Sequence, residues 1–165
     1  MSMHCTDILS RQGHRLIQVG VALFLFTSFE GFAIPFFASP LLGRSTHSLS
    51  ALFGIMLLTL GLSWPRLRVG AATSRIAFWC LLYSGLAITT AFLLAGIWGA
   101  GKSTMPLSGA PAGNALQEAA IMAVAYSSAP TGIISFALIF WGFRMPAKHG
   151  GGADPLNRND DGPIR

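Results

Sequence analysis

Charged side chains are scarce in this sequence. Only 10% of its 165 residues are Asp, Glu, Lys or Arg, whereas a soluble domain usually contains about 25%. The stretches 45–65, 76–101 and 119–143 contain none of these four residue types, and residues 16–43 contain only Glu30. Each stretch is about as long as the ~20 residues needed to cross a bilayer. The scarcity of charge therefore argues against an ordinary soluble domain and predicts a polytopic membrane protein.

Cysteine is also sparse, and the net charge is modest. Cys5 and Cys80 form no CxxC pair, and Cys80 lies inside an apolar run, so we expect no disulfide framework. A net charge of +5 would suggest a nucleic-acid partner only if the basic residues shared one face. They lie instead at the ends of the apolar runs, which is typical of membrane topology. We therefore expect a lipid bilayer as partner and no nucleic acid.

The apolar runs predict an all-α fold, an integral membrane four-helix bundle formed by residues 1–145. The expected helices cover residues 16–37, 46–64, 74–98 and 115–143. Pro40 and Gly43 are expected in the turn that follows the first helix. The polar tail, residues 146–165, carries too little apolar surface to be buried and is expected to be disordered in the cytoplasm.

The basic residues predict the orientation of the helices. They concentrate at the N-terminus, in the loop between the second and third helices and at the start of the tail: Arg11, Arg15, Arg66, Arg68, Arg75, Arg144 and Lys148. The other two loops contain only Arg44 and Lys102. The positive-inside rule then places both termini in the cytoplasm. We expect a multi-pass protein of the bacterial inner membrane.

One motif is a false match. Residues 96–103, GIWGAGKS, fit the phosphate-binding pattern G-x-x-x-x-G-K-[ST]. That loop needs a strand before it and a helix after it, so that backbone amides cradle the phosphates. Here an apolar helix precedes the motif and Met105-Pro106 follows it. We therefore do not expect nucleotide binding.

Two ionisable residues at membrane depth are candidates for chemistry. Glu30 should face the bundle interior or stay protonated, because an exposed charge is costly in the bilayer. It is either a proton carrier or a neutral carboxyl group bonded to another helix. His47 is the only histidine beside an apolar run on the predicted outer side. Its imidazole either binds metal or haem iron, or moves protons, or is simply an interfacial side chain.

Other polar residues are weaker candidates. Glu118 lies in the first turn of the fourth helix, where a carboxylate complements the helix dipole whether or not it acts in catalysis. Tyr83 and Tyr126 are expected to be buried at membrane depth, where each hydroxyl needs a partner. Ser84 can bond to its own helix backbone and so has no need of a functional role.

A resemblance to a known family follows from the segment between the first two helices. Pro35, Pro40, Gly43 and His47 fit P-x4-P-x2-G-x3-H, which resembles the hydroxylaminobenzene mutase family. Further similarities lie at Leu60–Arg68, Trp98–Gly101, Met105-Pro106, Gln117-Glu118 and Ile121. The resemblance covers residues 16–144. It implies a four-helix membrane enzyme that converts hydroxylaminobenzene to 2-aminophenol by moving oxygen from nitrogen to the ortho carbon.

A more distant resemblance is to styrene oxide isomerase. Residues 45–54, STHSLSALFG, are similar to a segment of that four-helix membrane enzyme. Its matching histidine is the axial ligand of a haem b whose ferric iron acts as a Lewis acid, and the enzyme is a trimer. The resemblance therefore implies that His47 binds haem b and that this chain forms a homotrimer.

The sequence departs from both families at polar positions. Phe53 stands where both families have Asn, and Ile88 stands where the mutases tend to have Asn. Ser84 lies near an Asp of styrene oxide isomerase, and Phe92 lies near a Tyr. Apolar residues have thus replaced part of a polar set that orients the substrate. The exchange implies a different substrate, or an activity that is weak or lost.

The combined hypothesis is a membrane isomerase that rearranges a small aromatic N-hydroxy compound. The expected catalytic residues are Glu30, Glu118 and Tyr83, with Glu118 or Glu30 moving the proton. His47 is expected to bind the cofactor and its metal, and Phe53, Phe92 and Ser84 are expected to bind the substrate. Three alternatives stay open at this point. They are a haem-dependent epoxide isomerase, a proton-coupled exporter of small molecules that uses Glu30, and an inactive relative that only binds apolar ligands.

Overall fold

The structure, a computed structural model, describes residues 3–144. Four long helices dominate it: α1 (Met3–Ala33), α2 (Pro40–Ser63), α3 (Ala71–Trp98) and α4 (Ala115–Arg144). Three short 3₁₀ turns complete the described elements: η1 (Ile34–Phe36), η2 (Trp64–Arg66) and η3 (Pro106–Ser108). Each long helix is long and apolar enough to cross a membrane. Because the described residues contain no strand, the predicted all-α fold with four spanning helices is confirmed.

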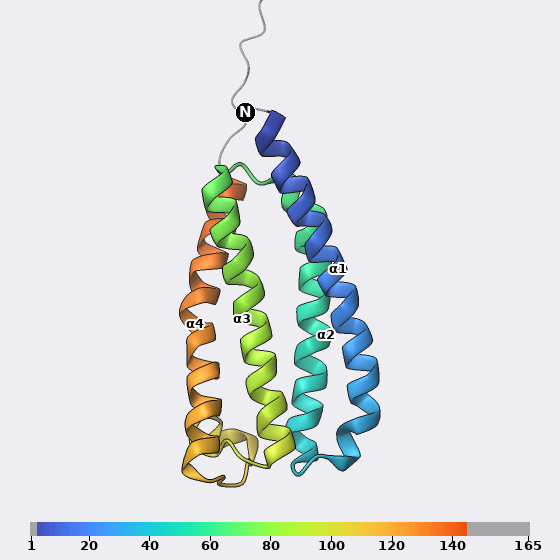
Figure 1. The fold of residues 1–165 in the computed structure, drawn as a ribbon, viewed down its shortest axis with the longest axis vertical. Coiled ribbons are helices and arrows are strands. Elements are labelled where there is room, and N and C mark those ends of the chain that lie inside the picture. The colour runs from blue at the N-terminus through green and yellow to red at the C-terminus, as the bar shows by residue number, and fades with distance from the viewer. Residues whose placement is uncertain (1–2, 145–165) are drawn as a thin grey trace, which may run out of the picture.

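Both ends of the described chain lie at the same end of the molecule (Figure 1). An even number of spans requires this arrangement, and it agrees with the predicted topology. The side of the membrane on which they lie stays a prediction. The expected disordered tail, residues 146–165, lies outside the described residues.

Two predicted helix boundaries are wrong. α1 begins at Met3 rather than near residue 16, because Leu9 and Leu16 occupy successive buried positions of one helical stripe. Packing of this stripe extends the helix through a polar stretch. α2 begins at Pro40 rather than near residue 46, so Pro40 and Gly43 lie in a helix and not in a turn. Proline is tolerated at the first helical position because its missing N–H would have no partner there.

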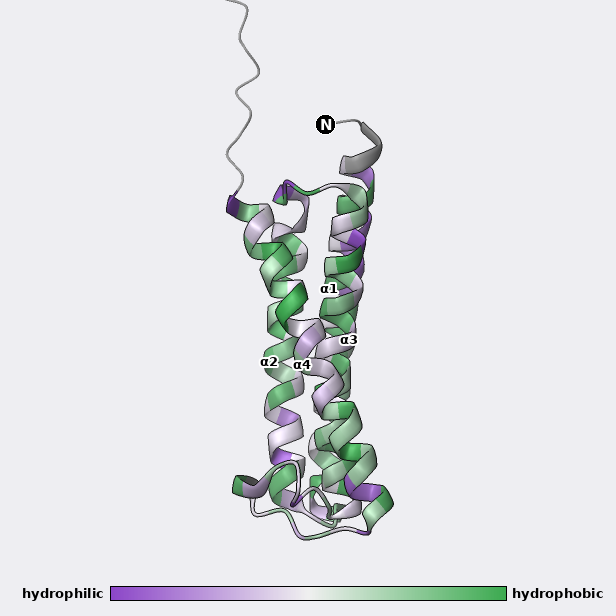
Figure 2. Cartoon of the chain, turned by 90° about the vertical axis from the view of Figure 1, so that its left-hand side faces the viewer, coloured by the Kyte–Doolittle hydropathy of each residue, from purple (hydrophilic) through white to green (hydrophobic). Residues whose placement is uncertain are grey.

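The helices form two antiparallel hairpins, α1 with α2 and α3 with α4 (Figure 1). The hairpins meet mainly along α2 and α3, where contact is less extensive than within either hairpin. Apolar ribbon dominates the middle of the long axis, and strongly hydrophilic segments gather toward the two ends (Figure 2). This distribution is what a bilayer-spanning protein requires.

Glycines set the distance between α1 and α2. A Cβ atom on Gly13 would lie 2.6 Å from the Gly61 carbonyl oxygen, and one on Gly20 would lie 2.9 Å from the Gly54 carbonyl oxygen. Both pairs repeat at seven-residue intervals along the two helices. Small residues at such spacing let membrane helices approach closely, since van der Waals contact is a main attraction between helices in lipid. The α1–α2 register is therefore fixed by backbone contact.

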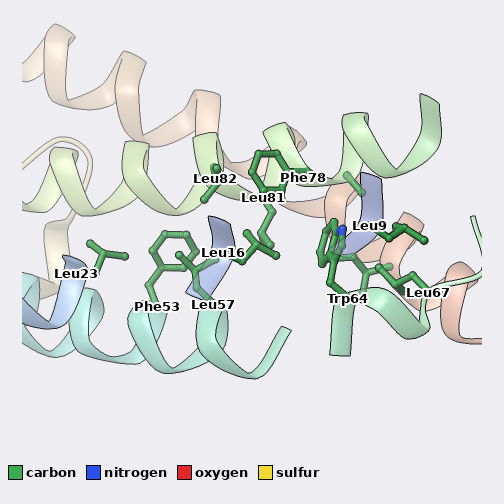
Figure 3. Close-up of a cluster of buried hydrophobic side chains, with 12 residues drawn as sticks. Leu9, Leu16, Leu23, Phe53, Leu57, Trp64, Leu67, Phe78, Leu81 and Leu82 are labelled. Atoms are coloured by element: carbon green, nitrogen blue, oxygen red, sulfur yellow. The ribbon is translucent and has the colours of Figure 1, made fainter. Parts of the chain in front are cut away.

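The main apolar cluster lies where the two hairpins meet (Figure 3). Leu16 and Leu23 of α1 join Phe53 and Leu57 of α2 and residues of α3 in this cluster. The Phe53 ring lies directly on Gly85 of α3, where a Cβ atom would overlap it. The ring thus fills the space that the glycine leaves open, and it couples the two hairpins.

Polar side chains connect α3 to α4. Ser135 donates a hydrogen bond to the Ala77 carbonyl at 3.0 Å, and Ser84 donates one to the Ser128 carbonyl at 2.8 Å. Such bonds favour helix association in lipid because their alternative partners are few. Hydrogen bonds between side chains and backbone carbonyls therefore help to hold the second hairpin together.

Substitution of Gly61 by alanine should lower the free energy of unfolding by about 1–3 kcal/mol, the usual cost of overpacking. The new methyl group would meet the Gly13 carbonyl oxygen at 2.8 Å and Ile17 Cγ1 at 2.7 Å. Equilibrium unfolding in mixed micelles with increasing dodecyl sulfate measures the change. Gly70→Ala is the control, because no atom lies within 4 Å of the added carbon. Equal effects of the two substitutions would refute the close approach.

Candidate functional site

Glu30 continues a buried stripe of leucines on α1. Leu9, Leu16 and Leu23 follow one another at seven-residue intervals, and Glu30 occupies the next position. It is only 5% exposed. The carboxyl group points inward because its position in the helix is a core position, which confirms the prediction that Glu30 faces the bundle interior.

His47 of α2 lies opposite this carboxyl group. Its Nδ1 atom is 3.3 Å from Glu30 Oε2, close enough for an ion pair. The ring packs on Gly31, where a Cβ atom would lie 3.2 Å from Cε1 and 3.4 Å from Nδ1. One turn along the hairpin, the Thr27 and Ser50 hydroxyl oxygens lie 2.8 Å apart. Polar groups from the two helices therefore meet at the same level of the hairpin.

The atoms at which Glu30 and His47 meet are buried, whereas part of the His47 side chain is exposed. In the described part of the chain, neither Glu30 oxygen nor His47 Nδ1 has an aligned hydrogen-bond partner, and all three atoms are buried. The His47 side chain is nevertheless 42% exposed. Since the Nδ1–Cε1 edge lies against Gly31 and Glu30, the exposure falls on the rest of the ring. Nε2 is therefore the ring nitrogen that the contact with Glu30 does not use.

Glu118 lies at the other hairpin and organises a loop. Its Oε1 accepts N–H bonds from Gly101, Lys102 and Gly113, at 2.8, 3.2 and 2.9 Å. Its Oε2 accepts one from Ser103 at 3.0 Å. Its place in the first turn of α4 agrees with the predicted dipole interaction. A proton-transfer role stays a prediction, but backbone amides already occupy both carboxylate oxygens.

The false phosphate-binding motif forms this same loop. Gly101, Lys102 and Ser103 belong to the G-x-x-x-x-G-K-S match, and their amides point at Glu118. Gly101 has φ +117°, a conformation that favours glycine. The loop is thus an anion-binding nest whose anion is a side chain of the same protein. Because Glu118 occupies these amides, they are not available to a nucleotide phosphate.

Tyr83 and Tyr126 lie on the surface of the single chain. Tyr83 is 50% exposed and Tyr126 is 61% exposed, so the prediction that both are buried is wrong for one protomer. Tyr83 lies next to the residues of α3 that face the other helices and is not one of them. Its hydroxyl oxygen is 2.8 Å from the Ser127 Oγ atom, and Ser84 bonds to α4 rather than to its own helix. Tyr83 and Ser84 therefore both connect α3 to α4.

The expected substrate residues line two neighbouring cavities. Phe53 and Ser84 line one of about 260 Å³, together with Ile88. Phe92 lines the other, of about 430 Å³. Leu49 and Leu52 line both, so the cavities adjoin along α2.

The candidate site residues thus fall into four places in one protomer. His47 and Glu30 form one pair, Glu118 lies in the first turn of α4, the expected substrate residues line the two cavities, and Tyr83 lies on the surface. Neither cavity is lined by His47, Glu30 or Glu118. The structure does not bring the predicted site together within a single chain.

Comparisons with known proteins decide the family. The styrene oxide isomerase family model matches residues 12–144. The chain belongs to the styrene oxide isomerase family. It is 37% identical over 165 residues to hydroxylaminobenzene mutase HabB of Ectopseudomonas oleovorans, an alignment that covers 99% of this chain and 96% of the relative. No solved structure matches this chain.

A second relative supports the same assignment. Hydroxylaminobenzene mutase HabA of the same organism is 32% identical over 93 residues, which cover 56% of this chain and 69% of the relative. Both resemblances inferred from the sequence are confirmed. This family member is a membrane-embedded isomerase of the mutase type, and the comparisons favour this function over an exporter.

We did not predict from the sequence that Glu30 pairs with His47, although the position of the turn between α1 and α2 indicates it. The hairpin turns at residues 37–39, and Glu30 and His47 stand at nearly equal separations from that turn. Thr27 and Ser50 do so as well. In an antiparallel hairpin such residues lie side by side, so the turn position alone would have paired them.

The Glu118→Gln variant should loosen the loop between α3 and α4 without unfolding the spans. An amide oxygen is a weaker acceptor than a carboxylate, and the amide NH₂ group would face backbone donors. Hydrogen exchange followed by mass spectrometry should show faster exchange in peptides covering residues 99–114. Gln117→Glu is the control because it keeps the acceptor that binds the Asn114 amide. Unchanged exchange in the first variant would contradict the assigned role.

Proposed function

We propose that this protein converts a small aromatic N-hydroxy compound to the ortho-aminophenol, as in the step from hydroxylaminobenzene to 2-aminophenol. In this isomerisation the N–O bond breaks, a C–O bond forms at the ortho carbon, and one proton moves from that carbon to nitrogen. The near full-length similarity to HabB supports the substrate class. The observation that carries the proposal is the His47–Glu30 pair inside two membrane-spanning helices.

We further propose that the His47 imidazole would hold a haem b. The described residues contain no group of three or more His, Cys, Asp or Glu that could hold a bare metal ion. A haem needs only one imidazole from the chain, and the free edge of His47 fits that need. A haem iron bound there would supply a Lewis acid for the substrate oxygen.

Glu30 has two roles in this proposal. A carboxylate beside one ring nitrogen of a ligating histidine orients the ring and leaves the other nitrogen as the ligand. Glu30 meets this requirement, since it lies at Nδ1. Its oxygens have no other partner in the described chain, so it is also the group best placed to hold the transferred proton.

The remaining parts of the site require a second copy of the chain. The His47 side chain is 42% exposed in one protomer, and it lines neither the cavity at Phe53 nor the cavity at Phe92. Residues of another copy would cover it and exclude water from the reaction. A homotrimer in the bacterial inner membrane, with both termini cytoplasmic, is the proposed assembly. The apolar cavity at Phe53 is large enough for an aromatic ring.

An isotope experiment tests the reaction. Purified protein in liposomes is given hydroxylaminobenzene labelled with ¹⁸O at the hydroxyl oxygen, in unlabelled water. We expect the 2-aminophenol to retain the label, because the oxygen moves within one molecule. Liposomes without protein are the control. Product that carries oxygen from the water would contradict the proposed transfer.

A second substrate class is favoured by the family model match, and the same preparation tests it. Styrene oxide supplied in place of the hydroxylamine should react more slowly, because the HabB similarity covers nearly the whole chain. A faster reaction with the epoxide would make epoxide isomerisation the main activity.

The His47→Ala variant should lose both the bound haem and the activity while the protein stays folded. The side chain is partly exposed, so its removal leaves the apolar cluster intact. Absorbance in the Soret region, normalised to protein concentration, measures haem. His14→Ala is the control, because His14 is an exposed histidine on α1. A variant at position 47 with an unaltered spectrum would remove His47 from the cofactor site.

The Glu30→Leu variant separates the role of Glu30 in positioning His47 from its contribution to the stability of the fold. Leucine continues the stripe of Leu9, Leu16 and Leu23, and it removes two buried oxygens that lack aligned partners, so stability should be kept or raised. Haem affinity should nevertheless fall about 10–100-fold, the usual effect of losing a carboxylate behind a ligating histidine. Haem titration of the apo-protein measures this change. Unchanged affinity in this variant would assign Glu30 no part in holding His47.

A further inference from the structure

Three arginines surround a small cavity at the end of the molecule that carries both described chain ends. Arg11 and Arg15 of α1 and Arg75 of α3 line a space of about 200 Å³, together with Trp79. The apolar run of α1 begins directly after Arg15, and that of α3 begins directly after Arg75. The cavity therefore lies at the boundary between the apolar span and the polar end of the bundle, at the level of lipid head groups.

No acidic side chain in the described chain neutralises this cluster. Residues 3–144 contain three carboxylates, and the only ion pair among those residues joins Glu30 to His47. Glu118 is bound by loop amides in the other hairpin. Asp7 precedes Arg11 by one turn on α1, and it is exposed and forms no ion pair with another residue of 3–144. Among the described residues, the cavity thus keeps an excess of positive charge.

A buried amide adds a neutral donor to the same cavity. Gln12, which also lines it, is 8% exposed and accepts a hydrogen bond from Trp64 Nε1 at 3.1 Å. Because that bond uses the amide oxygen, the NH₂ group of Gln12 is left as a donor. The lining therefore offers guanidinium and amide N–H groups, which suit an oxyanion.

An apolar groove lies between the same two helices, farther from the chain ends. Its volume is about 300 Å³. It is lined by Val19, Ala22 and Phe26 of α1 and by Leu86 and Leu93 of α3, among others. Val19, Ala22 and Phe26 follow Arg15, which lines the basic cavity, at helical spacing on one face of α1. A linear molecule lying along this face of α1 would therefore reach both the basic cavity and the apolar groove.

We propose that this surface binds an anionic phospholipid, with the phosphate on the arginines and an acyl chain along the apolar groove. Guanidinium groups recognise phosphate oxygens through paired hydrogen bonds, and basic pockets between membrane helices are suited to anionic head groups. Trp79 is 63% exposed at the same level, as is typical of the aromatic belt.

A second copy of the chain suits this surface less well. Its described residues would bring the same three arginines against one exposed carboxylate at this end, Asp7, so like charges would meet in excess. The lipid also lies between the two hairpins, where α1 and α3 make little direct contact. It would therefore act as a bridge between hairpins. This inference is independent of the proposed reaction, since none of these side chains lies beside His47.

Native mass spectrometry of the detergent-purified full chain tests the proposal. Phosphatidylglycerol and phosphatidylcholine with identical acyl chains are titrated separately, so that only the head group differs. We expect preferential binding of phosphatidylglycerol. Inorganic phosphate and a neutral monoacylglycerol form two further arms, and each should bind weakly alone because it offers half of the contacts. Equal binding of the two phospholipids, or saturation by phosphate alone, would overturn the assignment.

Matched variants locate the site. Arg15→Gln should weaken phosphatidylglycerol binding about fivefold, and combined replacement of Arg11, Arg15 and Arg75 by glutamine should weaken it roughly a hundredfold. Arg66→Gln is the control, because Arg66 is exposed at the same end but outside the cavity. An equal effect of this control would show unspecific attraction and refute the site.

A variant of the apolar groove completes the test. Ala22→Phe fills the groove without changing charge, and it should weaken binding of phosphatidylglycerol but leave the weak binding of phosphate unchanged. If the variant leaves phospholipid binding unchanged, the acyl chain does not use the groove. If it changes the oligomer mass in lipid-free detergent, the groove is an interface between copies, and the lipid proposal is wrong.

Discussion

The close approach of α1 and α2 is the contact on which the candidate site depends. Gly13 against Gly61 and Gly20 against Gly54 bring backbone atoms into contact and fix the register of the two helices. On α2, Gly54 lies seven residues before Gly61, and His47 lies seven residues before Gly54. The histidine therefore faces α1, where Gly31 gives its ring room and Glu30 supplies a carboxyl group. A larger side chain at any of these glycines would move the two helices apart and separate the pair.

In the Glu30–His47 pair one side chain is buried and the other is partly exposed, which suits ligand binding. Glu30 is in a core position and cannot reach solvent, whereas part of the His47 ring can. A buried acceptor behind an accessible imidazole is the arrangement that protein ligands of metals commonly use. Two other candidates have structural roles in the described chain, whether or not they also act in catalysis. Glu118 orders a loop, and Ser84 joins α3 to α4.

The two hairpins contact each other less than the helices within each hairpin do, and this has consequences for both proposals. Phe53 on Gly85 provides one strong contact between the hairpins. Elsewhere the α1–α3 side keeps a basic cavity and an apolar groove, which a phospholipid can fill. The contact between the two hairpins is narrow. Bound lipid and neighbouring copies should therefore stabilise this protein more than they would stabilise a fully packed bundle.

The sequence by itself determined the all-α class, the four spans and the family, because these depend on long apolar runs and on ordered short motifs. It also determined that Glu30 is buried, since a leucine stripe at seven-residue spacing leads to it. Tertiary structure decided what those residues meet. The start of α1 at Met3, the exposure of Tyr83 and the occupation of Glu118 by loop amides depend on packing between helices distant in sequence. Hydropathy reports the depth of a side chain in the bilayer, but the direction in which it points follows from the register and rotation of neighbouring helices, which backbone contacts set.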